Sequence, residues 1–388
     1  MTDTEHVDLA ILGGGCAGLS VARELVECGS KRRTVVLEPR HTYEDDRTWS
    51  FWSPSAHPLQ VLVSHRWRHW AYGLEGASPR RLSANNIHYQ VIRAIDFYQH
   101  ALALIDGSDS VALRRGAQVT ALSAEPKGWR IELANGDTLT ATAVIDTRPP
   151  PRQRVTASKL FQCFLGAEIE LAPDAAPFNA DSIELMTEMR STEQGFCFHY
   201  VLPFSENRAL VELTYFAPEQ LSQATLEPQF SDLLANREWQ SARVLRTEYG
   251  VLPMGLPECP SQPNPTLVRA GTSAGALRPA SGYGFLRIQR WARACVAHYQ
   301  RTGQLCGHPP EPWRQRHMDR LFLRTLRRDP ELAPALFDQL LSRCPPDRFV
   351  RFMTDQATWL DSLGIIKAMP KWPFIHTLIA TLLRRPDP

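Results

Sequence analysis

Several features that would restrict the function are missing from this chain. It has no apolar run of about 18 residues, the length that a membrane-spanning helix needs. Its eight cysteines form no CxxC pair, and its twelve histidines show no metal-ligand spacing. The polar start from Met1 to His6 does not resemble a signal peptide. These absences predict a cytoplasmic protein with reduced thiols and without a zinc or other metal site.

Charge and composition further limit the class of protein to which the chain can belong. The formal net charge of +2 gives no case for a nucleic-acid partner. Hydrophobic residues make up 43% and charged residues 22% of the 388 positions, which are values of a globular protein. A chain of this length is expected to form about two domains or one large, elaborated one.

The N-terminal region carries a dinucleotide-binding pattern. An apolar strand is predicted at 7–12, a glycine-rich turn at 13–18, a helix at 19–28 and a second strand at 34–37, which ends on Glu38. This order of strand, GxGxxG, helix, strand and acid is the context that gives the glycine motif its meaning.

Each residue of the pattern has a physical role. Gly13 is expected to make the tight turn, Gly15 to let the backbone approach a pyrophosphate, and Gly18 to let the helix pack closely on the strand. The helix N-terminus would face the phosphates. Glu38 could accept hydrogen bonds from a ribose. We therefore expect this region to bind a dinucleotide.

Two later segments favour FAD over NAD. Residues 117–146 predict strands around an Asn135-Gly136 hairpin turn, and the last strand ends at Asp146. The segment 268–275, VRAGTSAG, is similar to the late strand and glycine-rich turn with which FAD-dependent proteins of the p-hydroxybenzoate-hydroxylase type return to the cofactor. Thr272 stands where these flavoproteins usually have Asp.

One carboxylate lies inside a β-branched and aromatic run at 209–216. Leu210, Glu212 and Thr214 would share one strand face, with Val211 and Leu213 on the other. A carboxyl group buried in such a strand tends to stay protonated near neutral pH, which makes Glu212 a candidate acid. The alternative is an ordinary solvated strand face.

Four stretches, together with the glycine motif, resemble bacterial FAD-dependent lycopene β-cyclases: RTWSFW at 47–52, AVID at 143–146, the segment 202–215 and GTSAGALRPASGY at 271–283. Two positions depart from the family pattern. Arg278 replaces a common His, and Leu213 follows Glu212 where plant members have a second acid. The second departure argues against a mechanism that uses paired carboxylates.

The resemblance implies a function and a set of site residues. Glu212 would be the proton donor in the non-redox cyclisation of the ψ-ends of lycopene to β-ionone rings, giving β-carotene via γ-carotene. The cofactor would be FAD in its reduced form, with NAD(P)H or another reductant as the source of electrons. The expected cofactor-binding residues are Gly13, Gly15, Gly18, Glu38, Arg47, Asp146, Gly271, Gly275, Pro279 and Gly282.

The chemistry sets requirements that the residues can be tested against. An alkene is a very poor base, so the acid must be neutral, desolvated and aimed at the double bond. The carbocation must be kept from water and needs electron density nearby. Aromatic faces could help, and candidates are Trp49, Phe51, Trp52 and Tyr283. These side chains could equally be core packing.

The predicted architecture is α/β. Residues 1–150 and 266–300 would form a Rossmann-type FAD-binding domain with a helix near 89–105, and residues 151–265 an antiparallel-sheet substrate domain. Segments 161–166 and 196–200 are the expected walls of an apolar pocket. A proline-rich linker is expected at 253–265, and residues 301–388 would be helical.

The last third of the chain combines apolar, tryptophan and basic residues. A helix near 313–328 carries six arginines, and the segments 363–375 and 378–385 mix isoleucine, leucine, tryptophan and basic residues. Such segments can lie peripherally in a membrane interface, which suits a water-insoluble substrate. The alternative is a helical cap packed on the FAD domain.

Other functions remain open from the sequence. A related cyclase could act on another polyprenyl chain with Glu212 unchanged. A monooxygenase or prenyl reductase of the same fold would use Glu212 only structurally, and a flavin-binding protein without catalysis would not use it at all. A cyclase consumes no NAD(P)H per product, whereas a redox enzyme must.

Overall fold

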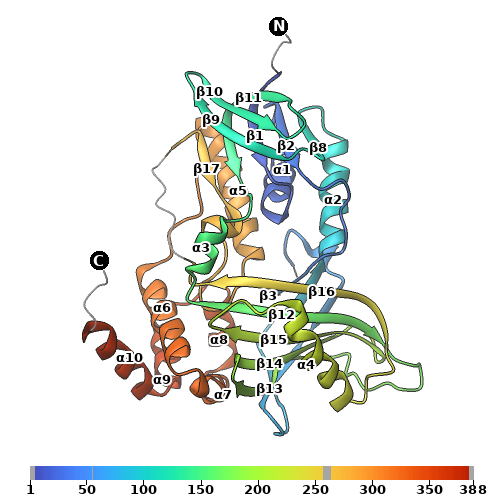
Figure 1. Ribbon diagram of the computed structural model, residues 1–388, viewed down its shortest axis with the longest axis vertical. Helices are drawn as coiled ribbons and strands as arrows, with labels where there is room; N and C mark the ends of the chain where they lie inside the picture. Colours follow the sequence, from blue (N-terminus) through green and yellow to red (C-terminus); the bar gives the residue numbers. More distant parts are fainter. Residues whose placement is uncertain (1–4, 55, 257–263, 384–388) are drawn as a thin grey trace.

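A computed structural model describes residues 5–54, 56–256 and 264–383 (Figure 1). The first four residues, Cys259, most of the expected linker and the basic residues Arg384 and Arg385 lie outside the described residues. Three β-sheets and a C-terminal group of helices make up the described part. In Figure 1 the first sheet lies at the N-terminal end, the second sheet crosses below it, and the C-terminal helices stand beside the second sheet.

The first sheet contains the predicted strand–turn–helix unit. Its neighbouring strands are β8 (Val111–Arg115), β2 (Thr34–Glu38), β1 (Glu5–Leu12), β11 (Thr138–Asp146), β10 (Gly128–Leu133) and β9 (Val119–Glu125), with β17 (Leu267–Arg269) also paired to β11. The pairs among β8, β2, β1, β11 and β17 are parallel, and β9 to β11 are antiparallel. Helices α1 (Cys16–Glu27), α2 (Ala94–Asp106) and α5 (Phe285–Thr302) share one apolar core with this sheet.

The expected helix at 89–105 is wrong in its first turn and a half. Residues His88–Arg93 form strand β7, and α2 begins only at Ala94. Strand β7 is the centre of a small antiparallel sheet between β3 (Thr48–Ser53) and β4 (His65–Trp67). Pairing on both edges overrides the helical spacing of the apolar residues, because propensity is a weak signal beside tertiary contacts.

The second sheet is long and mostly antiparallel. Its strands follow the order β16 (Arg243–Met254), β12 (Leu160–Glu170), β15 (Arg208–Ala217), β14 (Gly195–Pro203), β13 (Ser182–Thr192), β5 (His69–Leu74) and β6 (Arg80–Ser83). Strands β5 and β6 come from the part of the chain that sequence reasoning gave wholly to the FAD-binding domain; β5 pairs in parallel with β13. One face of the sheet packs on helix α4 (Gln223–Asn236), so the opposite face is free to line a cavity.

The described chain from Phe285 to Leu383 is mostly helical, in line with the helical region expected at 301–388. After α5 come α6 (Trp313–Arg328), α7 (Ala333–Arg343), α8 (Pro346–Met353), α9 (Trp359–Ala368) and α10 (Lys371–Leu383). Short helical segments are α3 (Arg152–Thr156) and the 3₁₀ turns Gln60–Leu62, Gly271–Ala274 and Pro330–Leu332. Within the described ranges, none of the helices combines the length and the apolar character needed to span a membrane.

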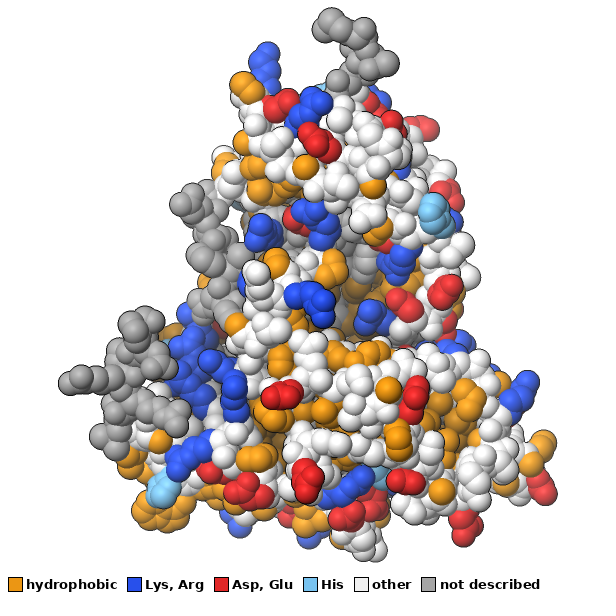
Figure 2. All heavy atoms as spheres, viewed as in Figure 1, with side chains coloured by type: hydrophobic (Ala, Val, Ile, Leu, Met, Phe, Trp, Pro, Cys, Tyr) orange, Lys and Arg blue, Asp and Glu red, His pale blue; other side chains and the backbone are white. Residues whose placement is uncertain are grey.

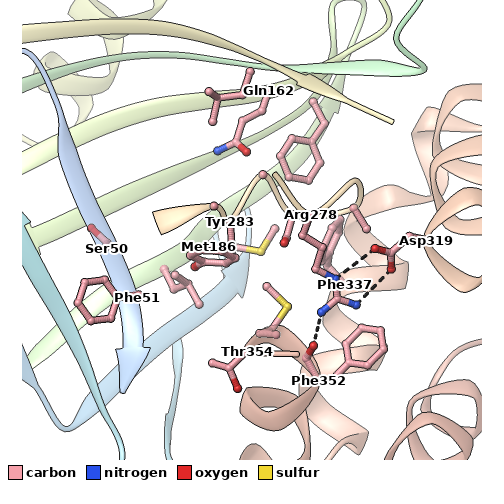
Figure 3. A pocket seen from close by; sticks show the side chains of 18 of the residues that line it. Ser50, Phe51, Gln162, Met186, Arg278, Tyr283, Asp319, Phe337, Phe352 and Thr354 are labelled. Atoms are coloured by element: carbon pink, nitrogen blue, oxygen red, sulfur yellow. Dashed lines mark hydrogen bonds and ion pairs between the residues drawn. The ribbon is translucent and has the colours of Figure 1, made fainter. Parts of the chain in front are cut away.

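A buried ion pair joins the loop before α5 to the C-terminal helices. Arg278 donates from Nε and Nη2 to the two carboxylate oxygens of Asp319 in α6, both at 3.1 Å. Both side chains are at most 3% exposed. Arg278 also donates to the carbonyl oxygen of Phe352 and lies over its ring (Figure 3). Three elements therefore depend on one guanidinium group.

We expect Asp319→Ala to lower the stability by about 3–5 kcal/mol, because it leaves the Arg278 charge buried without its partner. The measurement is the chemical denaturation midpoint. Arg33→Ala is the control: it breaks an exposed ion pair with Glu5 and should cost less than about 1 kcal/mol. Equal losses in the two variants would contradict the assigned role of burial.

Candidate active site

A cavity of about 580 Å³ lies between the second sheet, the loop before α5 and the C-terminal helices. Figure 3 shows side chains from these elements pointing into it, among them Gln162, Met186, Tyr283 and Phe337. Both predicted pocket walls take part through alternate residues, Gln162 and Phe164 from β12 and Phe198 and Tyr200 from β14. The lining is mainly apolar, as a site for an isoprenoid chain would require.

Glu212 lines this cavity from the middle of β15. Its strand neighbours Thr214 and Phe216 share the cavity face, whereas Val211 and Leu213 pack in the core under α4. The predicted division of the strand into two faces is therefore confirmed. Glu212 is half-buried on the cavity wall.

Burial raises the pKa of Glu212 well above its usual value of 4.5. The charge of Glu248 and a hydrogen bond with its carboxyl group raise this pKa further, while the charge of Arg246 lowers it. Both neighbours come from β16. The site thus holds a second carboxyl group that sequence reasoning missed, because nothing in the local sequence around Glu248 shows which strand lies beside β12.

Three tyrosine hydroxyl groups meet next to Glu212. Tyr89 from β7 hydrogen-bonds with Tyr200 from β14 and, at 3.1 Å, with Tyr283 from the loop before α5. Burial raises the pKa of all three hydroxyls well above the usual value of 10.0, so they stay neutral. Tyr200 lies directly opposite Glu212 in the sheet. The wall beside the carboxyl group is therefore polar but uncharged.

The aromatic residues of the RTWSFW segment pack in the core and also line the cavity. Trp49 and Phe51 stack on Phe285, with ring centroids 5.1 and 5.3 Å apart. Trp52 packs against Tyr89 and Tyr283 in a second core. All three residues also line the cavity. Core packing and a cavity wall are the same surface here.

The N-terminal glycines lie in a tight turn between β1 and α1. Gly13 has a φ of +99°, which favours glycine in the turn. A Cβ on Gly18 would lie 2.0 Å from the carbonyl oxygen of Gly13, so only glycine allows this close helix–strand contact. A Cβ on Gly15 would meet nothing within 4 Å, and Gly15 caps α1 without a side-chain hydrogen bond. Free space therefore faces the helix N-terminus.

Glu38 lies at the end of β2 and is engaged by its own chain. Its carboxylate accepts hydrogen bonds from the backbone N–H of Gly14 at 2.6 Å and from Arg40 Nε at 2.8 Å. Arg47 precedes β3, lines the cavity and is close enough to Cys16 in the glycine-rich turn to affect its pKa. Glu38 thus contacts Gly14 directly, and Arg47 lies close to Cys16 of the same glycine-rich turn.

The later residues expected to bind the cofactor approach the same region. Asp146 ends β11 and forms an ion pair with Arg148, while its carbonyl oxygen accepts from the N–H of Ala270 at 2.9 Å. A Cβ on Gly271 would lie 3.2 Å from Ala17 Cβ, which brings this segment against α1. Gly275 has a φ of +86° and faces free space.

Two residues of the loop before α5 differ in their position. Gly282 lines the cavity with a φ of +70°, and a Cβ there would lie 2.9 Å from Gln162 Oε1. Pro279 is not among the residues that line the cavity, although its neighbours Arg278 and Ala280 are.

Within the described part of the chain, no group of three or more His, Cys, Asp or Glu side chains is arranged to hold a metal.

Comparison with known proteins shows the family of this chain. The family model described as lycopene cyclase protein matches residues 8–379. The chain belongs to the lycopene cyclase family. A lycopene β-cyclase from Pantoea ananas is 27% identical over 397 residues, covering 97% of this chain and 98% of the relative. The family resemblance predicted from the sequence motifs is therefore confirmed.

Solved structures of similar shape belong to flavoproteins. A geranylgeranyl bacteriochlorophyll reductase-like protein from Thermoplasma acidophilum gives a TM-score of 0.62 at 13% identity, covering 98% of this chain and all of the other. A probable FAD-dependent monooxygenase from Pseudomonas aeruginosa gives 0.54 at 14% identity, covering 94% and 100%. These likenesses confirm the predicted fold class, an FAD-dependent-hydroxylase type of α/β fold that this member of the lycopene cyclase family combines with a C-terminal helical region.

The raised pKa of Glu212 makes the pH dependence of stability a test. As the pH rises through 4.5, Glu212 of the unfolded chain loses its proton while the folded protein keeps it, so stability falls with rising pH. Glu212→Gln removes this loss. Its melting temperature relative to the parent should therefore increase between about pH 4 and pH 7.5, by about 2 °C or more.

The matched control for this comparison is Glu227→Gln on the exposed face of α4. Its melting-temperature difference from the parent should stay nearly constant with pH. A constant difference for Glu212→Gln as well would show that Glu212 ionises normally.

Proposed function

We propose that this protein is a lycopene β-cyclase in which Glu212 is the proton donor. It would cyclise the ψ-ends of lycopene to β-ionone rings without net redox change, giving β-carotene via γ-carotene in carotenoid biosynthesis. The observation that carries the proposal is a glutamate with a strongly raised pKa on the wall of a mainly apolar, aromatic-lined cavity. Family membership supports the substrate class.

The acid would act by adding its proton to the terminal double bond of the ψ-end. The resulting tertiary cation is attacked by the neighbouring double bond, the ring closes, and a proton leaves the ring. An acid with a raised pKa is a weak acid, but it is present in its protonated form at neutral pH and is not surrounded by water. Both properties follow from the burial of Glu212.

The cavity walls would protect the cation. Water would quench it to an alcohol, so an apolar lining favours ring closure. Trp49, Phe51 and Trp52 face the cavity and present aromatic surfaces that can stabilise positive charge. The neutral hydroxyls of Tyr200 and Tyr283 contribute dipoles without adding a nucleophilic anion.

The residues around α1 suit FAD as the cofactor. The free space at Gly15 and Gly275, together with the uncapped N-terminus of α1, would hold the pyrophosphate. Gly13, Gly18 and Gly271 would shape the turn, Glu38 and Asp146 would lie beside it, and Arg47, Pro279 and Gly282 belong to the segments facing the cavity. FAD, reduced by NAD(P)H or another reductant, would supply electron density that stabilises a cation.

We further propose peripheral attachment to the cytoplasmic membrane through the C-terminal helices. Eight of the twelve large hydrophobic residues exposed in the described part lie on α9 and α10: Trp359, Leu360, Leu363, Ile366, Trp372, Ile375, Leu378 and Ile379. Figure 2 shows hydrophobic side chains together with Lys and Arg over this corner of the molecule. Ile366 and Ile375 are both exposed and line the cavity. A substrate dissolved in the bilayer could enter there.

The proposed activity predicts a colour change in cells. Expression of the parent in a lycopene-accumulating bacterium should convert red lycopene to orange β-carotene, whereas Glu212→Gln should leave the pigment red. The loss should be about 10²-fold or more, because the amide cannot donate a proton of comparable acidity. Chromatography of the pigments measures it. Full conversion by Glu212→Gln would contradict the assignment.

A stoichiometry measurement separates this function from a redox enzyme of the same fold. The purified, flavin-loaded protein should form many product molecules after a single reduction of its flavin. Consumption of one NAD(P)H per product would instead indicate a monooxygenase or a prenyl reductase.

The proposed membrane contact predicts flotation with liposomes that contain anionic lipid. Replacing Trp372, Leu378 and Ile379 together by Ser should abolish flotation, because each buried apolar side chain contributes about 1.5–3 kcal/mol. Val61→Ser/Val244→Ser is the control, since these residues are exposed but distant in sequence from α9 and α10. Unchanged flotation of the triple variant, and of a chain truncated before residue 363, would contradict the proposal.

A further inference from the structure

One row of residues crosses four strands of the second sheet. Tyr200 in β14 pairs with Glu212 in β15, Glu212 pairs with Gly166 in β12, and Gly166 pairs with Glu248 in β16. Directly opposite residues in an antiparallel sheet point to the same face. The two carboxylates are thus next neighbours on the cavity face, separated only by the glycine.

The missing side chain at Gly166 lets the two carboxyl groups meet. Strands two positions apart are separated by about 9–10 Å, and a side chain between them would normally fill the gap. A Cβ on Gly166 would lie only 2.7 Å from Glu212 Cγ, so the Glu212 side chain leans over the glycine. Glu212 therefore points toward β16, where Glu248 stands.

Glu248 is held from its other side. Its Oε2 accepts from Arg246 Nη1 at 2.9 Å and from Thr48 Oγ1 at 3.1 Å. Arg246 also donates to Glu168 at 2.8 Å, and the Glu248 side chain is only 3% exposed. These contacts fix the orientation of the Glu248 carboxyl group and place a positive charge against it. The two glutamates accordingly have different surroundings, one beside an arginine and one in the apolar cavity.

We propose that Glu212 and Glu248 form one carboxyl pair that carries a single proton, with Glu248 as the charged partner that keeps the proton on Glu212 and orients its carboxyl group. The inference rests on the proposed cyclase function and adds a positioning residue to it. The pair gives up its proton when a C–H bond forms on the alkene. It regains one when the ring cation loses a C–H proton, so protons and electrons balance without another reactant.

The pair also explains why a proton would return promptly. After donation, two carboxylates face each other, and their repulsion makes the pair a stronger base than either group alone. A single glutamate would not have this driving force. Proton recapture from the ring carbon then competes well with reaction of the cation with water or with the carboxylate oxygen.

Other groups around Glu212 do not replace Glu248 in this role. The hydroxyls that face it from β14, β7 and the loop before α5 are neutral, and Arg246 favours its ionised form. Most other charged residues that line the cavity have partners of their own: Arg47 with Asp46, Arg278 with Asp319, Arg287 with Glu311 and Asp355, and Arg290 with Asp355. Lys371 of α10 also lines the cavity, and its side chain is exposed. Behind Arg246 lie Glu168, Asp45, Arg93 and Arg208.

Glu248→Gln tests the pair. It removes the charge but keeps the shape and an acceptor for Arg246, so the Glu212 carboxyl group should ionise at a pH lower by at least about one unit. The high-pH decline of the cyclisation rate should move by the same amount, with a loss of about tenfold at a pH where the parent is still active. The rate at low pH should stay within a few-fold. Glu248→Asp, which keeps the charge, should restore most of the parent profile.

Two further variants separate this role from a structural one. Gly166→Ala changes no charge but pushes the carboxyl groups apart, so it should shift the profile in the same direction as Glu248→Gln. Glu184 lies on β13, forms an ion pair with Arg237 and is not among the residues that line the cavity. Glu184→Gln should therefore leave the pH profile of the rate unchanged. Uniform rate losses at all pH values, or an unshifted pH profile in Glu248→Gln, would contradict the proposal that the two glutamates share one proton.

An infrared titration of the protonated carboxyl band measures the ionisation of the same two glutamates without substrate. The band should be absent in Glu212→Gln and should titrate at lower pH in Glu248→Gln than in the parent. If the parent forms no cyclic product, the proposed function fails while this titration still decides the pair. If the parent cyclises lycopene but the band titrates identically in parent and Glu248→Gln, the pair fails and the function stands.

Discussion

The site depends on the cost of placing charge in an apolar cavity. Desolvation is the main cause of the raised pKa of Glu212, and the neighbouring Glu248 is the second. Desolvation works only if the carboxyl group cannot turn toward water. The sheet holds the strand that carries Glu212 in place, because β15 is paired on both edges and its opposite face is packed under α4. An exposed loop could not supply the same constraint.

The C-terminal helices complete what the sheet begins. The cavity is closed on one side by residues of α6 to α10, and the buried pair of Arg278 with Asp319 connects the loop before α5 to them. That loop follows Gly275, which belongs to the segment expected to contact the cofactor. The same ion pair therefore connects the segment proposed to contact the cofactor with the cavity wall. The solved structures of similar fold include a reductase-like protein and a probable FAD-dependent monooxygenase, so the fold alone does not specify the reaction.

Local signals made part of this structure predictable. The spacing of Gly13, Gly15 and Gly18 after an apolar strand specifies a turn that few other folds use, and alternation along β15 places Glu212 on one face. Sheet order is not local. Nothing near Gly166 or Glu248 indicates that β12 separates β15 from β16, so the second carboxylate could not be found. For the same reason β7 was mistaken for the start of a helix, since only its partners β3 and β4 favour the strand.

The departure at Leu213 takes on another meaning once the strands are in place. A residue adjacent to Glu212 in sequence points to the opposite face, and Leu213 accordingly packs in the core under α4. An acid at that position could not share the cavity face with Glu212 without a break in the strand. A partner for Glu212 must come from another strand, at a register set by pairing. Glu248 meets that condition through Gly166, and so the argument against paired carboxylates, which rested on position 213 alone, does not apply to this fold.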